Sequence, residues 1–432
     1  MKKASQSKKA DGSASLREGK NEEARPALVP KLRFPEFQLR GLWKSKRLGD
    51  LFSDRQESGL TGLPLLSLMD KEGIVPQEIS NRKNNSNNDK SKYLRVVPGD
   101  IAYNTMRMWE GRSALVGIEG LVSPAYTVCE PQAGVHSLFF SYYFKTPQLI
   151  EQFRRYSQGL VKDTLNLKYA AFSKISTAVP IFSEQQKIAE CLSSLDELMA
   201  AQARKVDALK THKKGLMQQL FPREGETQPR LRFPEFRDAG EWEEQSIGDF
   251  GHVVTGSTPN TAQPAFYGGG IPFVSPADIS DLRFVTQTKS SLTSKGFLET
   301  RHVRAGSVLF VCIGSTIGKV AQSVHDCATN QQINAVIPNS KHFDDFVYFA
   351  LSYASDRIAV LAGRQAVPII NKSLFSSVQL LVPKLPEQKR IADCLSSLDV
   401  LIASETNKLG VLKTHKKGLM QQLFPSPENI EA

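Results

Sequence analysis

The residues that could do chemistry are basic and amide side chains in turn-rich stretches. The run NRKNNSNNDKSKY at 81–93 interleaves asparagine with four cations, and Arg107 and Arg112 flank a Met-Trp-Glu string. Arginine and asparagine pair bidentately with guanine and adenine edges in the major groove, and lysine contacts phosphates. Each of these residues alone is more often a solvated surface group, but as a set they favour double-stranded DNA as a partner. The predicted DNA-binding residues are Arg82, Lys83, Lys90, Lys92, Arg107, Arg112, Lys289, Lys295, Lys319, Arg364 and Lys372.

Other strings suggest enzymatic chemistry but lack the patterns that it needs. GSTIGKV at 314–320 is similar to a phosphate-binding loop, but it is one residue short between its glycines and has Val320 where a hydroxyl would hold the metal. FYGGGIP at 266–272 predicts a tight turn rather than a dinucleotide site. The seven histidines show no metal-ligand spacing. We therefore assign no catalytic residue, no metal ligand and no cofactor to this chain.

Composition sets broad limits on the class of protein. The chain has 432 residues, with 55 Lys and Arg against 44 Asp and Glu, which gives a net charge of +11. A basic chain of this kind often meets a polyanion, although the charge alone leaves a protein with no special ligand equally open. No run of about 20 apolar residues occurs, so no membrane span is expected. The five cysteines are scattered, which favours a reducing cytoplasm.

The elements that must position these side chains are duplicated. LKTHKKGLMQQLFP occurs at 209–222 and again at 412–425. LRFPEF stands at 32–37 and 231–236, and CLSSLD at 191–196 and 394–399. The stretches between these repeated strings differ in the two halves. Sequence change has therefore accumulated in the middle of each half and not at its two ends. The chain is a tandem duplication, and its identical strings would present one surface twice, which suits two copies of one partner.

The two segments that are nearly identical within the chain predict two long helices of about 55 Å each at about 1.5 Å per residue. Ser183 and Gln186 form a capping-box pattern at the start of the first, and Pro386 suits the first turn of the second. Unbroken heptad spacing predicts that the helices pair as an antiparallel coiled coil, with pseudo-two-fold symmetry and polar seam positions at Gln202, Glu405, Lys213 and Lys416. The alternative is that each helix packs only on its own domain. The apolar seam residues are Ile188, Leu192, Leu195, Met199, Val206, Leu209, Leu216, Leu220, Ile391, Leu395, Leu398, Ile402, Leu409, Leu412, Leu419 and Leu423.

The divergent middles mix short β-like runs, such as 303–314 and 94–105, with helical patterns at 137–156 and 346–362. They predict two α/β or α+β domains in tandem, each followed by a long helix. The expected division is a disordered basic tail (1–30), a first variable domain (31–181), long helix 1 (182–222), a linker (223–230), a second variable domain (231–384), long helix 2 (385–425) and a tail (426–432).

Together these motifs resemble those of the specificity subunits of type I restriction-modification systems, over residues 31–425. The resemblance rests on LRFPEF followed by Trp and Gly-Asp, on GSTP (256–259) followed by YGGGIP (267–272), and on EQQKIAECLSSLD or EQKRIADCLSSLD with the LKTHKKGLMQQLF ending. The first half departs from the pattern because it lacks a clear GSTP box; GLTGLP at 59–64 is the nearest string.

The resemblance implies a non-catalytic subunit for DNA sequence recognition. Each variable domain would read one half of a bipartite, asymmetric target, and the paired helices would set the unread gap. The helices would also dock two methyltransferase subunits, and a motor-nuclease subunit would complete the complex. S-adenosylmethionine, ATP and magnesium would then bind to those partners. Two other hypotheses stay open, a free-standing sequence-specific DNA-binding protein and an enzyme in its own right.

Overall fold

The computed structural model describes residues 29–69, 73–80, 89–363 and 367–425. It divides into two compact units: residues 1–197 with 413–432 form unit 1, and residues 198–412 form unit 2. Both long helices are divided between the two units, whereas the division predicted from the sequence makes each helix a separate segment. The basic tail predicted to be disordered, 1–30, lies outside the described residues except for residues 29 and 30, and so does the second tail, 426–432.

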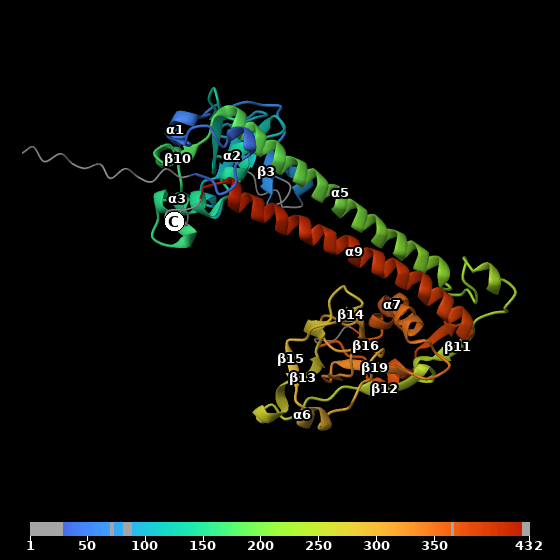
Figure 1. Cartoon of the computed structure of the whole chain (residues 1–432). Coiled ribbons are helices and arrows are strands. Elements are labelled where there is room, and N and C mark those ends of the chain that lie inside the picture. Colours follow the sequence, from blue (N-terminus) through green and yellow to red (C-terminus); the bar gives the residue numbers. More distant parts are fainter. Residues whose placement is uncertain (1–28, 70–72, 81–88, 364–366, 426–432) are drawn as a thin grey trace, which may run out of the picture. The chain divides into compact units, whose positions relative to one another are not determined.

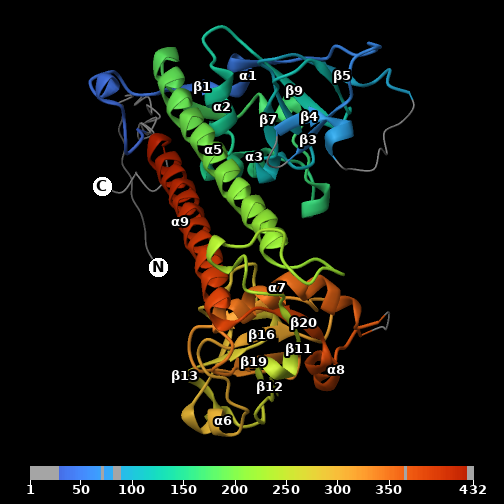
Figure 2. The same ribbon diagram turned by 90° about the vertical axis from the view of Figure 1, so that its right-hand side faces the viewer.

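Unit 1 is built on antiparallel strands. Its largest sheet has the strand order β2-β9-β6-β7, and β1-β10, β3-β4 and β5-β8 form two-stranded sheets. Its shorter helices α2 and α3 lie beside the sheet strands (Figure 2), and their aromatic residues share one buried cluster with residues of the largest sheet. Its strands are β1 (Lys44–Arg47), β2 (Phe52–Asp54), β3 (Leu66–Met69), β4 (Gly73–Pro76), β5 (Leu94–Val96), β6 (Ile101–Asn104), β7 (Ser113–Leu115), β8 (Gly120–Val122), β9 (Tyr126–Pro131) and β10 (Ser176–Val179). Its shorter helices are α1 (Leu48–Leu51), α2 (Ser137–Tyr143), α3 (Pro147–Tyr156) and α4 (Tyr169–Phe172).

Unit 2 contains a larger mixed sheet of order β12-β19-β16-β17-β14, in which only the β14–β17 pair is parallel. A smaller sheet has the order β15-β13-β18, and β11 pairs with β20. Its strands are β11 (Glu243–Ser246), β12 (Gly251–Thr255), β13 (Tyr267–Val274), β14 (Phe284–Val285), β15 (Ser290–Leu292), β16 (Val308–Val311), β17 (Val320–Ser323), β18 (Ala328–Thr329), β19 (Ile333–Pro338) and β20 (Gln379–Val382). Its shorter helices are α6 (Ser294–Leu298), α7 (Asp344–Val360) and α8 (Lys372–Ser377).

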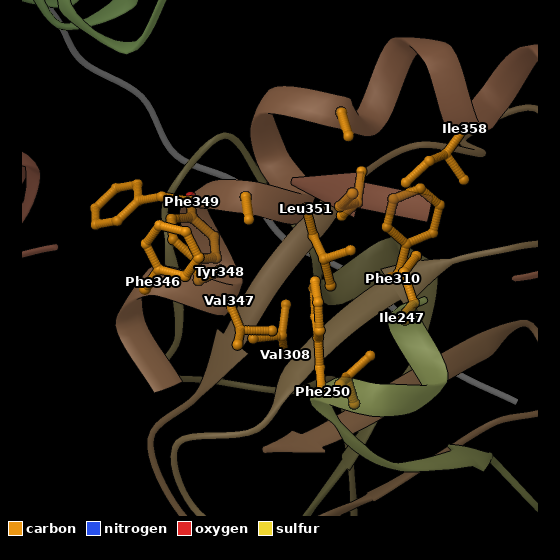
Figure 3. Packing of buried hydrophobic residues seen from close by; sticks show 14 of the residues in the cluster. Ile247, Phe250, Val308, Phe310, Phe346, Val347, Tyr348, Phe349, Leu351 and Ile358 are labelled. Atoms are coloured by element: carbon orange, nitrogen blue, oxygen red, sulfur yellow. The ribbon is translucent and has the colours of Figure 1, made fainter. Parts of the chain in front are cut away.

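The main core of unit 2 lies between α7 and the larger sheet (Figure 3). Val308 and Phe310 of β16 point toward α7, where Phe346, Val347 and Leu351 meet them. The alternate residues of β16 belong to a second cluster on the opposite face, because successive side chains of a strand point to opposite sides. This two-sided burial explains why β16 reads as an uninterrupted apolar run.

The two long helices are α5 (Phe182–Leu220) and α9 (Leu385–Leu423). The predicted capping box of the first is wrong. The helix begins at Phe182, so Ser183 lies inside the first turn, and the Gln186 amide instead donates to Glu190. The backbone N–H groups of Glu184 and Gln185 both donate to the carbonyl of Ile181, which therefore precedes the helix.

Two other local predictions need correction. The helical pattern at 137–156 is two helices, α2 and α3, because Pro147 begins the second and disfavours helix in the residue before it. FYGGGIP is not a tight turn; most of it belongs to strand β13, whose pairing with β15 shifts register between Tyr267 and Ile271. Gly268, at φ +81°, provides the left-handed residue that this irregularity needs. The predicted fold class, tandem α/β units with paired long helices, is confirmed.

Candidate nucleic-acid interface and its helical frame

The motif that begins each half, LRFPEF with the tryptophan that follows it, holds the start of the long helix of the same half. In unit 1 the Arg33 guanidinium binds the buried Glu184 carboxylate, with Nη2 to Oε2 at 2.7 Å, and Trp43 donates its indole N–H to the same carboxylate at 3.2 Å. Unit 2 repeats this triad: Arg232 binds Glu387 at 2.8 Å and Trp242 donates at 3.4 Å. The hydrogen bonds that Arg33 donates to Glu184 raise the pKa of Arg33 above its ordinary value, so this guanidinium stays charged.

The same motifs also contact the end of the other helix. The Leu32 N–H donates to the Gln422 carbonyl at 3.0 Å within unit 1, and the Leu231 N–H donates to the Gln219 carbonyl at 2.9 Å within unit 2. These bonds satisfy carbonyls that the last turn of a helix leaves without a partner. The two most strictly repeated strings therefore touch each other, which gives their identity a structural reason.

The core of each unit combines the beginning of one long helix with the end of the other. In unit 1, Ile188 and Leu192 of α5 share a cluster with Leu423 of α9. In unit 2, Ile391 and Leu395 of α9 share a cluster with Leu220 of α5. The alternative in which each helix packs only on its own domain is therefore wrong.

The helices run antiparallel along the seam, and polar pairs mark their register. In unit 2 the Gln202 amide donates to Glu405 at 2.6 Å, and Lys213 binds Asp399. Figure 1 shows the two helices side by side there. In unit 1 Lys416 binds Asp196 at 2.6 Å, which repeats the Lys213–Asp399 pair 203 residues along the chain. All sixteen apolar residues of the predicted seam are buried or half-buried.

Each seam lysine also meets an aromatic ring of its own unit. The Lys213 ammonium lies 5.0 Å from the ring centre of Phe349, and the Lys416 ammonium lies 4.8 Å from that of Tyr142. The rings and carboxylates together compensate two cations at half-buried positions. The pair at Gln202 is not repeated, because Glu405 itself stands at the equivalent place in the second copy. Hydrogen bonds from Gln202, and then from Lys408 and Lys205, lower the pKa of Glu405 to about 2.

The predicted DNA-binding residues have different surroundings in unit 1. Arg82 and Lys83 lie outside the described residues. Arg107 and Arg112 both bind Glu110, at 3.3 and 3.5 Å, so the structure brings these two together. Lys90 lies over the ring of Tyr93 at 4.7 Å and Lys92 is exposed.

In unit 2 the predicted residues are more dispersed. Arg364 lies outside the described residues. Lys289, Lys295 and Lys372 are exposed on three different segments. Lys319 is half-buried and donates its ammonium to the Ile279 carbonyl at 3.1 Å, so part of its hydrogen-bonding capacity is used inside the unit. The GSTIGKV string that contains Lys319 connects β16 to β17.

Two loops of unit 1 meet at one edge and form a candidate reading surface. The Leu167 N–H donates to the Thr105 carbonyl at 2.8 Å, which joins the loop at 104–112 to the loop at 157–168. The first loop is held internally by the Trp109 indole, which donates to the Met106 carbonyl at 2.9 Å. Arg107, Lys162 and Lys168 are exposed on this surface. Cations on rigidly joined loops suit the backbone and base edges of a duplex.

In unit 2 the GSTP loop packs tightly on the loop at 329–333. The Ser257 N–H donates to the Thr329 carbonyl at 2.9 Å, and the Thr258 hydroxyl donates to the Gln331 side chain at 2.8 Å. A Cβ added at Gly256 would stand 2.1 Å from the Asn330 carbonyl oxygen, so only glycine permits this approach. The β16–β17 connection joins them, because the Cys312 N–H donates to the Gln332 carbonyl at 2.8 Å.

This convergence exposes amide residues that the sequence analysis missed. Asn330, Gln331 and Gln332 follow one another in the string TNQQIN, and Gln331 is exposed. Asparagine and glutamine are the side chains that pair with adenine. Three consecutive amides after a short strand were a visible signal, but their importance depends on the loops that surround them.

The described residues offer neither a metal-ion cluster nor a membrane-crossing helix. Among the described residues, no group of three or more His, Cys, Asp and Glu side chains is arranged to hold a metal ion. In that same part of the chain, no helix has the length and hydropathy needed to cross a membrane.

Comparison with known proteins first defines a class. Residues 239–414, most of unit 2 with the first part of α9, match the family described as "Type I restriction modification DNA specificity domain". The resemblance to specificity subunits of type I restriction systems is thereby confirmed.

Particular relatives are distant. The chain is 31% identical to the specificity subunit of the type I restriction enzyme HindI from Haemophilus influenzae over 150 residues, which is 33% of this chain and 32% of that protein. It is 23% identical to the putative MjaX specificity subunit from Methanocaldococcus jannaschii over 78% of this chain and 80% of that one. The S subunit structure from M. genitalium matches with a TM-score of 0.58 at 13% identity, over 92% of this chain and 100% of that one, which shows the fold.

Proposed function

We propose that this protein is the non-catalytic DNA sequence-recognition subunit of a type I restriction-modification complex. Each unit would read one half of a bipartite asymmetric target with its own loops. The observation that carries this proposal is the combination of a duplicated helical frame with two sets of unlike loops. Different readers on one frame account for identity at the repeats and divergence between them.

The two reading surfaces differ in chemistry. Unit 1 offers Arg107, Lys162 and Lys168 near its joined loops, whereas unit 2 offers the amides at 330–332 beside the GSTP loop. Arginine pairs best with guanine and amides with adenine. Unlike surfaces of this kind would read unlike half-sites, so the target would be asymmetric. The exposed lysines at 289, 295 and 372 would add phosphate contacts in unit 2.

The seam would act as a ruler between the two reading surfaces. Its register is marked by the Lys213–Asp399 and Lys416–Asp196 pairs, which resist sliding because a slip would leave half-buried charges without partners. The unread gap in the target would therefore depend on helix length.

The helices would also dock two methyltransferase subunits. Leu198 and Leu401 are equivalent positions, and their side chains are 51% and 40% exposed within the described chain. Exposed apolar positions on a helix are suited to packing against a partner helix. The exposed lysines that are identical in both copies add a repeated charge to this surface; they are Lys210, Lys214, Lys413 and Lys417.

The chemistry would belong to the partners. A methyltransferase subunit would hold S-adenosylmethionine and flip the target adenine, and a motor-nuclease subunit would use ATP and magnesium. This chain would contribute no catalytic residue. A DNA-reading subunit would work in the cytoplasm, where the DNA lies.

The test is a map of methylated adenines across the native host's genome, with this gene intact and with it deleted. We expect one split, asymmetric methylated motif to disappear on deletion. An unchanged map from a host whose methyltransferase gene is expressed would contradict the proposal. It would favour a free-standing DNA-binding protein instead.

A further inference from the structure

Strands β1 and β11 occupy equivalent places in the two units. Each follows a buried tryptophan, Trp43 or Trp242. Each pairs antiparallel with the strand that precedes a long helix, and the registers correspond: Lys44 is opposite Val179, and Glu243 is opposite Val382. β1 lies beside α1 in unit 1 (Figure 2). The frame is therefore the same at these two strands.

The charges on the two strands are opposite. β1 has the sequence KSKR and all four side chains are exposed. β11 has the sequence EEQS, and Glu243 and Glu244 are exposed. Other charged residues of the frame are the same in both copies, as with Lys213 and Lys416 or Asp196 and Asp399, and where the long helices differ a charge is lost or gained rather than reversed. A reversal at one equivalent surface strand indicates that the two strands have different neighbours.

A fourth cation lies next to β1. The Leu48 N–H donates to the Ile175 carbonyl at 2.8 Å and the Gly49 N–H donates to the Ser173 carbonyl at 3.0 Å. These bonds hold the exposed Lys174 beside the end of β1. In unit 2 the Ile247 N–H donates to the Val378 carbonyl at 2.9 Å, and the neighbouring residue there is the uncharged Ser377.

We call Lys44, Lys46, Arg47 and Lys174 the basic patch; Lys44 and Lys46 share one side of β1, Arg47 faces the other side, and all four are exposed. Among the described residues, no carboxylate lies within ion-pair distance of any of the four side chains. Asp50, the first acidic residue after β1 in the sequence, accepts a hydrogen bond from the Arg47 backbone N–H at 3.2 Å. Within the part of the chain that the structure describes, ion pairing therefore uses none of the four charges.

The patch continues toward the reading surface of unit 1. Lys168 is the residue before the four-residue helix α4, and Lys174 is the second residue after it, so a single short helix separates the two lysines. Leu167, next to Lys168, holds the loop that carries Arg107. Cations thus occur on the reading loops, on both sides of α4 and on the edge strand, and a duplex offers such a series one phosphate charge per about 1.7 Å of its axis.

We propose that the basic patch binds the phosphate backbone of duplex DNA beside the half-site read by unit 1, and that unit 2 has no equivalent contact. This rests on the proposed DNA-reading function. A protein partner present in two copies would need like surfaces on both units, so the charge reversal disfavours it. The protein would hold one side of its target more firmly, by a contact that carries no sequence information.

The test measures binding of the full-length chain to a fluorescent 40-base-pair duplex of random sequence, from about 50 to 200 mM salt. The variant carries Lys44→Gln, Lys46→Gln, Arg47→Gln and Lys174→Gln. Since each neutralised phosphate contributes about 0.9 to the slope of log affinity against log salt, we expect the slope to become shallower by about 2–4. The matched control neutralises four exposed cations to which no binding role is assigned, Arg237, Lys341, Lys384 and Lys389, and should keep the wild-type slope.

A second variant moves the patch to unit 2, with Glu243→Lys, Gln245→Lys and Ser246→Arg. It should steepen the slope, because it adds the missing contact. Equal slopes for wild type and patch variant would overturn the inference while leaving the proposed function standing. A patch variant that keeps its DNA slope but loses a methyltransferase subunit would also overturn it, in favour of a protein surface. Failure of the wild type to bind DNA at all would remove the proposed function itself.

Discussion

At the scale of single residues, the frame depends on buried ion pairs that join distant parts of the chain. Glu184 is 1% exposed and accepts from both Arg33 and Trp43. Because these partners are 151 and 141 residues away, the bonds close the fold of unit 1 rather than a local turn. The identical triad in unit 2 indicates that the requirement is geometric and independent of what each unit reads.

Replacing Glu184 with alanine should therefore destabilise unit 1 strongly. It removes the carboxylate that pairs with the Arg33 guanidinium, which keeps only the carbonyls of Arg40 and Gly41, and it leaves the Trp43 indole N–H without its acceptor. Breaking a buried ion pair in this way typically costs about 3–5 kcal/mol. Urea unfolding measures the loss. The control is Glu36→Ala, which breaks an exposed pair with Lys187 at 3.6 Å and should cost less than about 1 kcal/mol. Similar losses for the two variants would mean that the triad has no special role.

The central seam pair should make stability depend on pH. The pKa of Glu405, held at about 2, is depressed in the folded state. Its contribution is therefore complete above the ordinary carboxyl pKa near 4.5 and is lost as pH falls toward 2. Gln202→Glu would place a second carboxylate against Glu405, so the thermal midpoint should fall at pH 7 and recover as the pH is lowered toward 4.5.

Exchanging the two residues, with Gln202→Glu and Glu405→Gln together, is the control for this prediction. It keeps one amide and one carboxylate at the seam and should restore most of the lost midpoint at pH 7. A double variant no more stable than Gln202→Glu alone would show that the pair does not interact as described.

At the scale of elements, α5 and α9 are heptad helices whose length sets a distance. Inserting four residues into both adds about 6 Å, and seven residues add about 10 Å, at about 1.5 Å per residue. Since base pairs rise about 3.4 Å, the gap in the recognised target should grow by about two and about three base pairs. The half-sites should stay the same, because the reading loops are untouched.

Methylation mapping of hosts that carry these insertions checks the prediction. The seven-residue insertion keeps the seam pattern, so it is the better-behaved variant, whereas four residues shift the seam locally. An unchanged gap in an active seven-residue variant would exclude the helices as the ruler.

At the scale of the whole molecule, duplication predicts the number of partners. Lys214 and Lys417 are exposed equivalents on the repeated surface. We expect two methyltransferase subunits per wild-type chain, one after either Lys214→Glu or Lys417→Glu, and none after both, because charge reversal opposes docking at each copy separately. Native mass spectrometry reads these ratios directly. Arg204→Glu, at a position where the second copy has Asn407, is the control and should still bind two.

Much of the architecture could be predicted, because it follows from the local spacing of apolar and polar residues. Heptad spacing marks the seam from residue types alone, and the polar positions at Gln202 and Glu405 are visible as interruptions of that spacing. Helix ends were harder: α5 begins at Phe182 without the expected cap. Caps depend on one or two hydrogen bonds, and residues with no capping side chain also begin helices.

The reading surfaces depended on the tertiary structure. Arg107 and Arg112 were predicted from type, but the exposed Gln331 gained its meaning only when Thr258, 73 residues away, was found bonded to it. Likewise only the fold placed Lys174 beside β1. The sequence by itself determined the duplication, the paired helices and the basic character, because those follow from repeats, spacing and counts. Which loops meet was decided by long-range packing, because loops carry no period of their own and are positioned by the cores beneath them.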